Sequence, residues 1–380
     1  MRATHYSWIV SNDKGWTLGH VAGTPVHLRP NALLMVGVFA ALYFPLFSSR
    51  AASQGGAIAA SVALGAVILV SIFVHEVAHV LVAKSYGVRA DEISLNMLGG
   101  HASFTSQFKR PWHGAVTALS GPLANVMLGL VFLVIVRSAS EYSIVLEVVN
   151  IAAVMNFFLA LFNALPGLPL DGGSAVSALI WNFTGSQSKG LTVAARIGQA
   201  VAVLWLLWAV VRPLLQGHSP DIVILMWTLM LVMVLWSGAT ASLRRAKYLQ
   251  AVEKLDLASI TTPARTVVAH TSVREVVSQM LGAQDSTTTV VLSETGNPIG
   301  YVDPLALSSV GVEVQEYTPV AAVSIPLLPG AVIDATARPQ ELLSRVNVGH
   351  DTRTLYVVAQ DGRVTGVVWV ASLIRALNLH

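Results

Sequence analysis

The feature that most constrains this chain is a series of six long segments without a single charged residue. They cover residues 30–49, 51–74, 111–136, 148–170, 197–211 and 222–243. A helix needs roughly 20 apolar residues to cross about 30 Å of hydrocarbon, and five of the six runs reach that length. The run 197–211 is short, but apolar residues continue it upstream past Arg196. We predict a polytopic α-helical membrane protein with about six transmembrane helices, or five if one run lies along the membrane surface.

Charged residues divide the chain into two parts. They make up 11% of the sequence, whereas globular domains carry about 25%. Residues 1–248 hold 23 of them and residues 249–380 hold the other 20 in little more than half that length. We therefore predict an N-terminal segment 1–30, a membrane domain 31–248 and a soluble C-terminal domain 255–380. No signal peptide is evident in residues 1–30, which lack an apolar core.

Two compositional facts exclude whole classes of site. The chain has no cysteine, so it has neither a disulfide framework nor a metal site with cysteine ligands. Its net charge of +3 is small and dispersed, so we expect no nucleic-acid partner.

The distribution of Lys and Arg predicts how the chain is oriented in the membrane. Three of these residues, Arg50, Arg137 and Arg212, fall on one side of the predicted membrane. Eleven fall on the other: Arg2, Lys14, Arg29, Lys84, Arg89, Lys109, Arg110, Lys189, Arg244, Arg245 and Lys247. Because cytoplasmic loops carry the excess of positive charge, we expect both termini and the C-terminal domain in the cytoplasm, with the protein in the cell membrane.

The end of the second run carries an HExxH motif, His75-Glu76-Val77-Ala78-His79. Residues i and i+4 share a face of a helix, so both imidazoles can reach one tetrahedral Zn²⁺. Glu76 is then placed to accept a proton from a water molecule as a general base. A five-residue pattern can arise by chance, but ionisable groups at such depth are costly and indicate function. Counting back from Lys84, the two histidines lie roughly 8–14 Å inside the membrane.

Two histidines need a third ligand, and the candidate is Asp171, just past the fourth run. Pro166 and Pro169 end the helix before it, and Gly172 and Gly173 allow the backbone to turn toward the bundle. Such non-helical backbone is accepted in membranes where it is buried in protein or lines a cavity. The alternative is a simple helix-terminating loop with a solvated Asp171.

These motifs resemble the site-2 protease family of intramembrane zinc metalloproteases. HExxH is followed by Asn163-x-x-Pro-x-x-Pro-Leu-Asp171-Gly-Gly, and the segment 120–125, Ser-Gly-Pro-Leu-Ala-Asn, is similar to the central small-residue motif of that family. The resemblance covers roughly residues 20–250. It implies one Zn²⁺ per chain bound by His75, His79 and Asp171, with Glu76 as general base and Asn163 holding the substrate carbonyl. It also implies a zinc-dependent endopeptidase in the lipid bilayer that cleaves transmembrane segments of membrane proteins, such as an anti-sigma factor, in regulated proteolysis.

The segment 88–108 between the second and third runs leaves two interpretations open. It is rich in β-forming residues around Gly99-Gly100, so it could form a hairpin whose free edge pairs with an extended substrate. It could equally be a plain cytoplasmic loop. His101 could approach the metal, although a surface histidine is the favoured interpretation. His27 and His113 receive no role.

The C-terminal domain contains an internal repeat with an offset of 66 residues. Residues 272–278 align with residues 338–344, and Gly300 aligns with Gly366. In each copy a helical pattern precedes two β-rich runs joined by a Gly-containing turn. This pattern resembles a tandem pair of CBS domains, an α/β fold, over about residues 255–380. CBS pairs that bind adenine nucleotides usually hold the ribose with an Asp, where this chain has Ala306 and Ser372. Nucleotide binding is therefore not expected, and a structural or homodimerising module is an equal alternative.

Two other classes of function remain as alternatives to a protease. A CBS pair could gate a membrane transporter or channel, and a non-catalytic adaptor could bind transmembrane helices. A transporter gives no reason for Glu76 to follow His75, and an adaptor need not keep Glu76. The complete ligand set favours the enzyme.

Overall fold

The computed structural model of the protein describes residues 15–97, 99–104, 108–141, 143–283, 287–337, 343 and 354–377. By its internal contacts the chain divides into two units, one ending at Lys247 and the other continuing from Tyr248. Each unit has hydrophobic clusters of its own. The cations Arg2 and Lys14, which entered the predicted orientation, lie outside the described residues.

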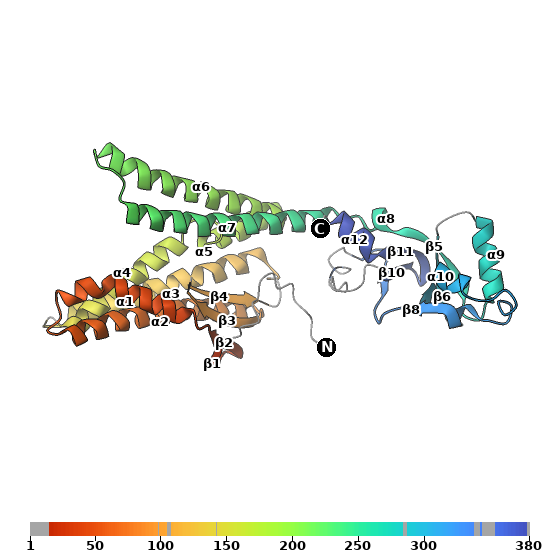
Figure 1. Ribbon diagram of the computed structural model, residues 1–380, viewed down its shortest axis with the longest axis horizontal. Coiled ribbons are helices and arrows are strands. Elements are labelled where there is room, and N and C mark those ends of the chain that lie inside the picture. The colour runs from red at the N-terminus through yellow and green to blue at the C-terminus, as the bar shows by residue number, and fades with distance from the viewer. Residues whose placement is uncertain are drawn as a thin grey trace. The chain divides into compact units, whose positions relative to one another are not determined.

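A helix covers most of each of the six uncharged runs, as predicted (Figure 1). The helices are α1 (Ala32–Ser48), α2 (Gln54–Ser85), α3 (Pro111–Ser138), α4 (Ile144–Asn163), α6 (Gln187–Leu215) and α7 (Ile222–Lys254). Among the described residues, five helices are long and apolar enough to cross a membrane, whereas α1 has 17 residues. At 1.5 Å per residue α1 measures about 26 Å, slightly less than the hydrocarbon thickness.

The fourth run departs from the sequence prediction. Helix α4 ends at Asn163 instead of continuing to Leu170, and a further helix, α5 (Asp171–Thr184), begins directly after the loop. Pro166 and Pro169 cannot supply helical N–H donors, which explains the break. Within the loop, the N–H of Leu168 donates to the carbonyl of Ala194 in α6 at 3.1 Å. The loop is therefore fixed against a neighbouring helix.

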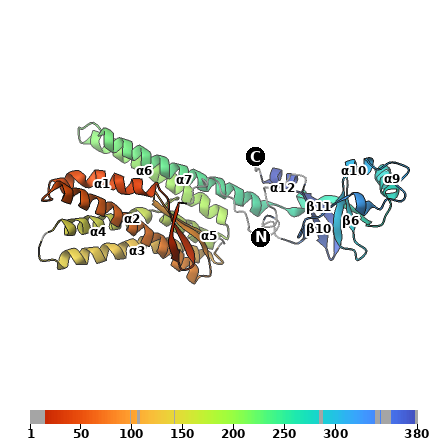
Figure 2. The same ribbon diagram turned by 60° about the horizontal axis from the view of Figure 1, so that its bottom comes forward.

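Helix α2 is the centre of the first four helices and packs against α1, α3 and α4 (Figure 2). Close approach to α1 depends on Gly65, where a Cβ would lie 2.7 Å from the carbonyl oxygen of Val36. Small residues allow such approach in membranes, where packing rather than exclusion of water drives association. The most buried part of α2 therefore lies between its neighbours and away from lipid.

A four-stranded sheet lies beside α2, which decides the open interpretation of the segment 88–108 in favour of a hairpin. Its strands are β1 (Trp16–Val21), β2 (Thr24–Leu28), β3 (Ala90–Asn96) and β4 (Gly99–Phe104), in the order β1-β2-β3-β4. Val26, Ile93 and Ala102 pack on the α2 side of the sheet. In the described part of the chain β4 pairs with β3 alone, so its other edge is open.

The second unit is an α/β fold around a seven-stranded sheet. Its strands follow the order β8-β7-β6-β5-β11-β10-β9. The strands are β5 (Thr262–Val268), β6 (Thr288–Leu292), β7 (Pro298–Val302), β8 (Ser324–Pro326), β9 (Val332–Asp334), β10 (Leu355–Gln360) and β11 (Arg363–Trp369). The helices are α8 (Leu257–Ile260), α9 (Val273–Ala283), α10 (Pro304–Ser308), the 3₁₀ turn η1 (Val320–Val323) and α12 (Val370–Ala376).

The internal repeat is visible in this sheet. The hairpin β6–β7 is followed by α10, which begins at Pro304, and the hairpin β10–β11 is followed by α12, which begins 66 residues later at Val370. Gly296 and Gly362, in the two predicted turns, have φ of 84° and 77°, a region that favours glycine. The repeat segment 338–344 lies outside the described residues except for position 343.

Candidate metal centre

Helix α2 carries the HExxH motif in its buried part. The helix continues past the apolar run to Ser85, so His75, Glu76 and His79 belong to one unbroken helix. Only 7%, 6% and 7% of these three residues are exposed. Three ionisable side chains buried in a membrane helix require compensating partners.

The loop after α4 brings Asp171 to these histidines. A Cβ on Gly172 would clash with the backbone of Ala164, and one on Gly173 would clash with the backbone of Gly167, so both glycines permit the tight fold of the loop. Packing of small residues then holds α5 against α3. The residues in contact are Ala115 and Ala118 of α3 with Ala175 and Ala178 of α5. Asp171 is the first residue of α5, and its position is thereby fixed.

Three potential ligand atoms converge at one point. Oδ2 of Asp171 lies 2.9 Å from Nε2 of His75 and 3.4 Å from Nε2 of His79, and the three atoms all lie within 4.8 Å of one another. Tetrahedral ligands about 2.0–2.1 Å from a zinc ion are roughly 3.3 Å apart. The spacing therefore fits a zinc site with a fourth position left open.

The outer nitrogens of both imidazoles show which atoms face the centre. Nδ1 of His79 lies 2.7 Å from the carbonyl oxygen of Thr117, which can only accept, so Nδ1 is the donor. Nδ1 of His75 lies 2.5 Å from Oδ1 of Asn125 and donates in the same way. Each neutral ring then presents the Nε2 lone pair to the Asp171 carboxylate. Two imidazole nitrogens and one carboxylate oxygen around one point form a ligand set typical of zinc, and the acceptors behind both rings orient them as partners outside a metal site do.

Space for an ion exists because α3 has a glycine at the point of closest approach. A Cβ on Gly121 would lie 2.6 Å from Nε2 of His75 and would also clash with Nε2 of His79. Any larger residue would fill the volume beside both ligand nitrogens. The residues present therefore fit a metal ion in both chemistry and space.

Glu76 faces the edge strand of the sheet. A Cβ on Gly100 would lie 2.5 Å from Cγ and 2.9 Å from Oε1 of Glu76, so the strand can approach this closely because position 100 is glycine. The backbone N–H of Ala102 donates to the Glu76 carboxylate. Strand β4 therefore borders the centre through the edge that does not pair with β3.

Asn163 occupies the last position of α4, eight residues before Asp171. Its side chain is half-buried and makes no hydrogen bond with the residues that the structure describes. It is not one of the groups that contact the His-His-Asp cluster, and its amide is available to another molecule.

The other histidines lie away from the cluster. Strand register places His101 opposite Ser94, which pairs with His27, and these side chains occupy the sheet face opposite to Ala102. Desolvation and Arg29 lower the pKa of His101, although Glu92 opposes them. By its accessible surface, however, His101 is an exposed residue, in agreement with the interpretation as a surface histidine. The ring of His113 stacks on Tyr86 with 4.0 Å between ring centroids.

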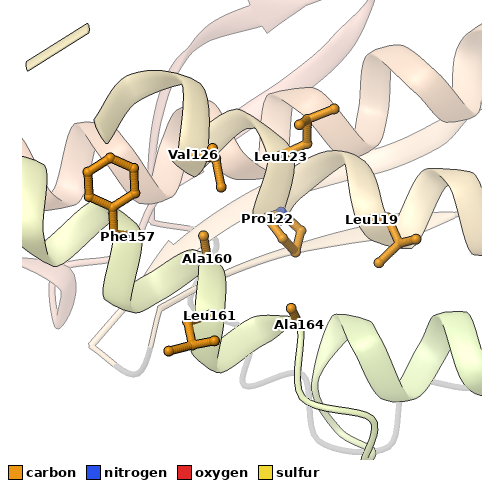
Figure 3. A pocket seen from close by; sticks show the side chains of 8 residues that line it. All are labelled: Leu119, Pro122, Leu123, Val126, Phe157, Ala160, Leu161 and Ala164. Atoms are coloured by element: carbon orange, nitrogen blue, oxygen red, sulfur yellow. The ribbon is translucent and has the colours of Figure 1, made fainter. Parts of the chain in front are cut away.

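A groove of about 470 Å³ between α3 and α4 does not belong to this centre (Figure 3). It is lined by Leu119, Pro122, Leu123, Val126, Phe157, Ala160, Leu161 and Ala164. None of these side chains can bind a metal or move a proton. Large exposed leucines on its walls mark it as part of the surface that meets lipid.

The sequence interpretation assigned no role to the groups behind the histidines, although Asn125 ends the segment 120–125 that it singled out. Asn125, Asn156 and Ser71 are at most 1% exposed and form a hydrogen-bonded chain that ends at His75. A usable signal was present, because Asn156 is a polar residue inside an apolar helix and buried polar groups there need partners. Gly100 could not be singled out without the strand pairing.

Comparison with known proteins agrees with this geometry. The model of peptidase family M50 matches residues 63–144 and 136–205, the region that contains His75, Glu76, His79 and Asp171. The chain is 26% identical over 374 residues to "Putative zinc metalloprotease sll0528" of Synechocystis sp., with 95% of each protein covered.

Two solved structures are similar to separate parts of the chain. One is a site-2 protease from Methanocaldococcus jannaschii, with 24% identity, a TM-score of 0.42 and coverage of 60% of this chain and 94% of that one. The other is the CBS domain of a bacterial CNNM/CorC family Mg²⁺ transporter, with 14% identity, a TM-score of 0.28 and coverage of 39% and 93%.

The apolar helices, the His-His-Asp cluster and the zinc metalloprotease relatives define a multi-pass membrane metalloendopeptidase that uses Zn²⁺. The part of the chain that carries the candidate metal centre matches the model of peptidase family M50, and the chain as a whole is similar to curated putative zinc metalloproteases. This result favours the enzyme over the transporter and the adaptor that the sequence left as alternatives.

Proposed function

We propose that His75, His79 and Asp171 hold the zinc ion and that Glu76 is the general base of peptide hydrolysis. The observation that carries this proposal is the convergence of two Nε2 atoms and Oδ2 of Asp171, with both Nδ1 atoms occupied as donors. When bound, zinc polarises the scissile carbonyl and lowers the pKa of water. Glu76 accepts the proton of the attacking water and delivers it to the leaving amine.

Asn163 is proposed to hold the substrate carbonyl. Its amide can donate to a carbonyl oxygen, and it has no partner among the described residues that would compete. Asn163→Ala should therefore lower the turnover number while the zinc content stays at the wild-type value. Loss of zinc in that variant would instead place Asn163 in the metal site.

The substrate proposed for this centre is a transmembrane segment of another protein, locally unwound into an extended strand. The open edge of β4 lies next to Glu76 and offers backbone groups for strand addition, which brings an extended peptide to the centre. By analogy with the family, an anti-sigma-factor-like membrane protein is the proposed substrate class in regulated intramembrane proteolysis.

We further propose a cell-membrane location with both termini and the residues 255–380 in the cytoplasm. The excess of Lys and Arg on one side of residues 31–248 supports this orientation. Regulation and homodimerisation by the C-terminal domain are proposed on its resemblance to CBS pairs. The last candidate membrane span belongs to helix α7 (Ile222–Lys254), which continues without a break to the start of that domain and offers a mechanical connection.

A co-expression experiment tests the proposed catalysis. Wild type and Glu76→Gln are expressed with tagged candidate membrane proteins, and cleavage is followed by the size of the tagged fragment. Glu76→Gln should lose cleavage by more than the roughly 10²–10⁴-fold of ordinary acid–base assistance, because the amide can neither accept the proton nor orient the water. Cleavage at the wild-type rate would assign the base to another residue. Equal zinc in both proteins is the control for folding.

A further inference from the structure

A chain of buried polar groups connects three helices behind His75. Nδ1 of His75 lies 2.5 Å from Oδ1 of Asn125 in α3, and Nδ2 of Asn125 lies 2.8 Å from Oδ1 of Asn156 in α4. Nδ2 of Asn156 lies 3.0 Å from Oγ of Ser71, which returns the chain to α2. Asn125 and Ser71 are 1% exposed and Asn156 is 0% exposed, so water does not compete for these groups.

The direction of each hydrogen bond in this series of side chains follows from the contacts of Asn156 in α4. Asn156 lies 2.9 Å from the carbonyl of Ala152, and because that oxygen can only accept, the amide nitrogen of Asn156 must face it. The oxygen of Asn156 then faces Asn125 and accepts from its nitrogen. This leaves the oxygen of Asn125 to face His75, where it accepts from Nδ1–H. Ser71 completes the chain by donating to the carbonyl of Val67 at 2.9 Å.

The two proposed histidine ligands are oriented by different kinds of partner. His79 donates to the backbone carbonyl of Thr117, and this oxygen can only accept a hydrogen bond. His75 donates to a side-chain amide, which could turn over and present its nitrogen instead. With the amide reversed, Nδ1 of His75 would have to accept, and the ring proton would move to Nε2, where it would block the metal. The correct state of His75 therefore depends on what holds Asn125.

We propose that Asn125 is a positioning residue for His75 and that Asn156 and Ser71 set its orientation. These three residues, which we call the amide relay, keep the proton of His75 on Nδ1 and direct the Nε2 lone pair toward the centre. This proposal rests on the proposed function in one respect, since it takes His75 as a zinc ligand. It predicts an effect on metal affinity and on the ligand field of the bound metal.

The first test compares two substitutions at Asn125 in full-length protein purified in detergent. Asn125→Leu keeps the approximate volume but removes the acceptor, so zinc affinity in a chelator competition should fall by about 10- to 100-fold. Asn125→Asp keeps an oxygen that accepts from Nδ1, and its second oxygen, when protonated, can donate to Oδ1 of Asn156. This variant should therefore retain zinc affinity within a few-fold of wild type. The absorption spectrum of the Co²⁺-loaded protein should change in the Leu variant and remain close to wild type in the Asp variant.

The matched control is Asn150→Leu, the same substitution in α4 on a half-buried residue outside the relay. It should leave zinc affinity and the Co²⁺ spectrum unchanged. Thermal unfolding of the metal-free proteins separates a loss of fold from a loss of positioning. If Asn125→Leu is too unstable to measure, the comparison at position 156 decides the proposal.

The second test separates orientation from simple packing. Asn156→Leu frees the amide of Asn125 to turn over, so zinc affinity should fall. A carboxylate has two equivalent oxygens and needs no partner to orient it, so Asn125→Asp should restore zinc affinity when combined with Asn156→Leu. The double variant also removes the Asn156 oxygen that would face the new carboxylate.

Three outcomes would overturn the proposal: wild-type zinc affinity in Asn125→Leu, wild-type affinity in Asn156→Leu, or no restoration in the double variant. His75→Ala distinguishes these from a failure of the proposed function. Zinc retained in His75→Ala would mean that His75 is not a ligand, whereas zinc lost in His75→Ala but retained in Asn125→Leu would reject the relay alone.

Discussion

Oδ2 of Asp171 lies 2.9 Å from Nε2 of His75 although 96 residues separate the two along the chain. The contact joins the C-terminal half of α2 to the first residue of α5. Helix α5 begins there because two prolines end α4 and two glycines allow the loop between them to fold tightly. The Asp171 carboxylate and the ring nitrogens of His75 and His79 therefore lie together inside the membrane domain. Ionisable groups at this depth need a partner, and a bound cation would supply it.

The first prediction concerns zinc content. Purified wild type should contain about one equivalent of zinc, and Asp171→Ala should lose most of it, because two histidines alone leave a tetrahedral ion with too few protein ligands. Elemental analysis of protein dialysed against a weak chelator measures this. His113→Ala, which alters a histidine stacked on Tyr86, should retain its zinc. Undiminished zinc in Asp171→Ala would reject the third ligand.

The second prediction concerns the space for the ion. Gly121→Ala should abolish zinc binding, because its Cβ would lie 2.6 Å from Nε2 of His75. A matched control is Gly37→Ala in α1, where a Cβ meets nothing within 4 Å. That change should be neutral or stabilise the helix by up to about 1 kcal/mol. Zinc at wild-type levels in Gly121→Ala would show that the ion does not lie beside this glycine.

The third prediction separates the base from the ligands. Gly100→Ala should push the Glu76 side chain from its place against β4, because the added Cβ would lie 2.5 Å from Cγ of Glu76. Proteolysis should fall by at least 10-fold while zinc content remains normal, since no ligand is touched. Steady-state cleavage and elemental analysis on the same preparation test both halves. Concurrent loss of zinc would contradict the separation.

The fourth prediction concerns the C-terminal domain. Ala306 and Ser372 stand where CBS pairs that bind adenine nucleotides have a ribose-binding Asp, so ATP, ADP and AMP should bind weakly or not at all. Calorimetry with the full-length protein measures this. A dissociation constant near 1 µM, which corresponds to about −8 kcal/mol, would contradict the prediction and make the domain a nucleotide sensor.

Local patterns were sufficient for much of this protein. The uncharged runs indicated the membrane helices, the i and i+4 spacing placed His75 and His79 on one face, and the 66-residue offset indicated a repeated tail whose helices begin at Pro304 and Val370. Each is a property of contiguous residues, because hydrogen bonding inside lipid forces a helix and helical periodicity then sets the faces. The end of α4 and the existence of α5 were harder to predict, because they depend on how the proline-rich loop packs.

The sequence by itself determined the membrane class and the HExxH face, and it indicated Asp171 as the candidate third ligand. Only the tertiary structure decided which groups meet across helices. It showed that the segment 88–108 is a hairpin instead of a plain loop, and that β4 lies against Glu76. It also showed that Asn125 contacts His75, with hydrogen-bond directions that follow from the contact of Asn156 with the Ala152 carbonyl. The physical reason is that these contacts depend on the separation and rotation of packed helices, which small residues such as Gly121 set and which no local pattern records.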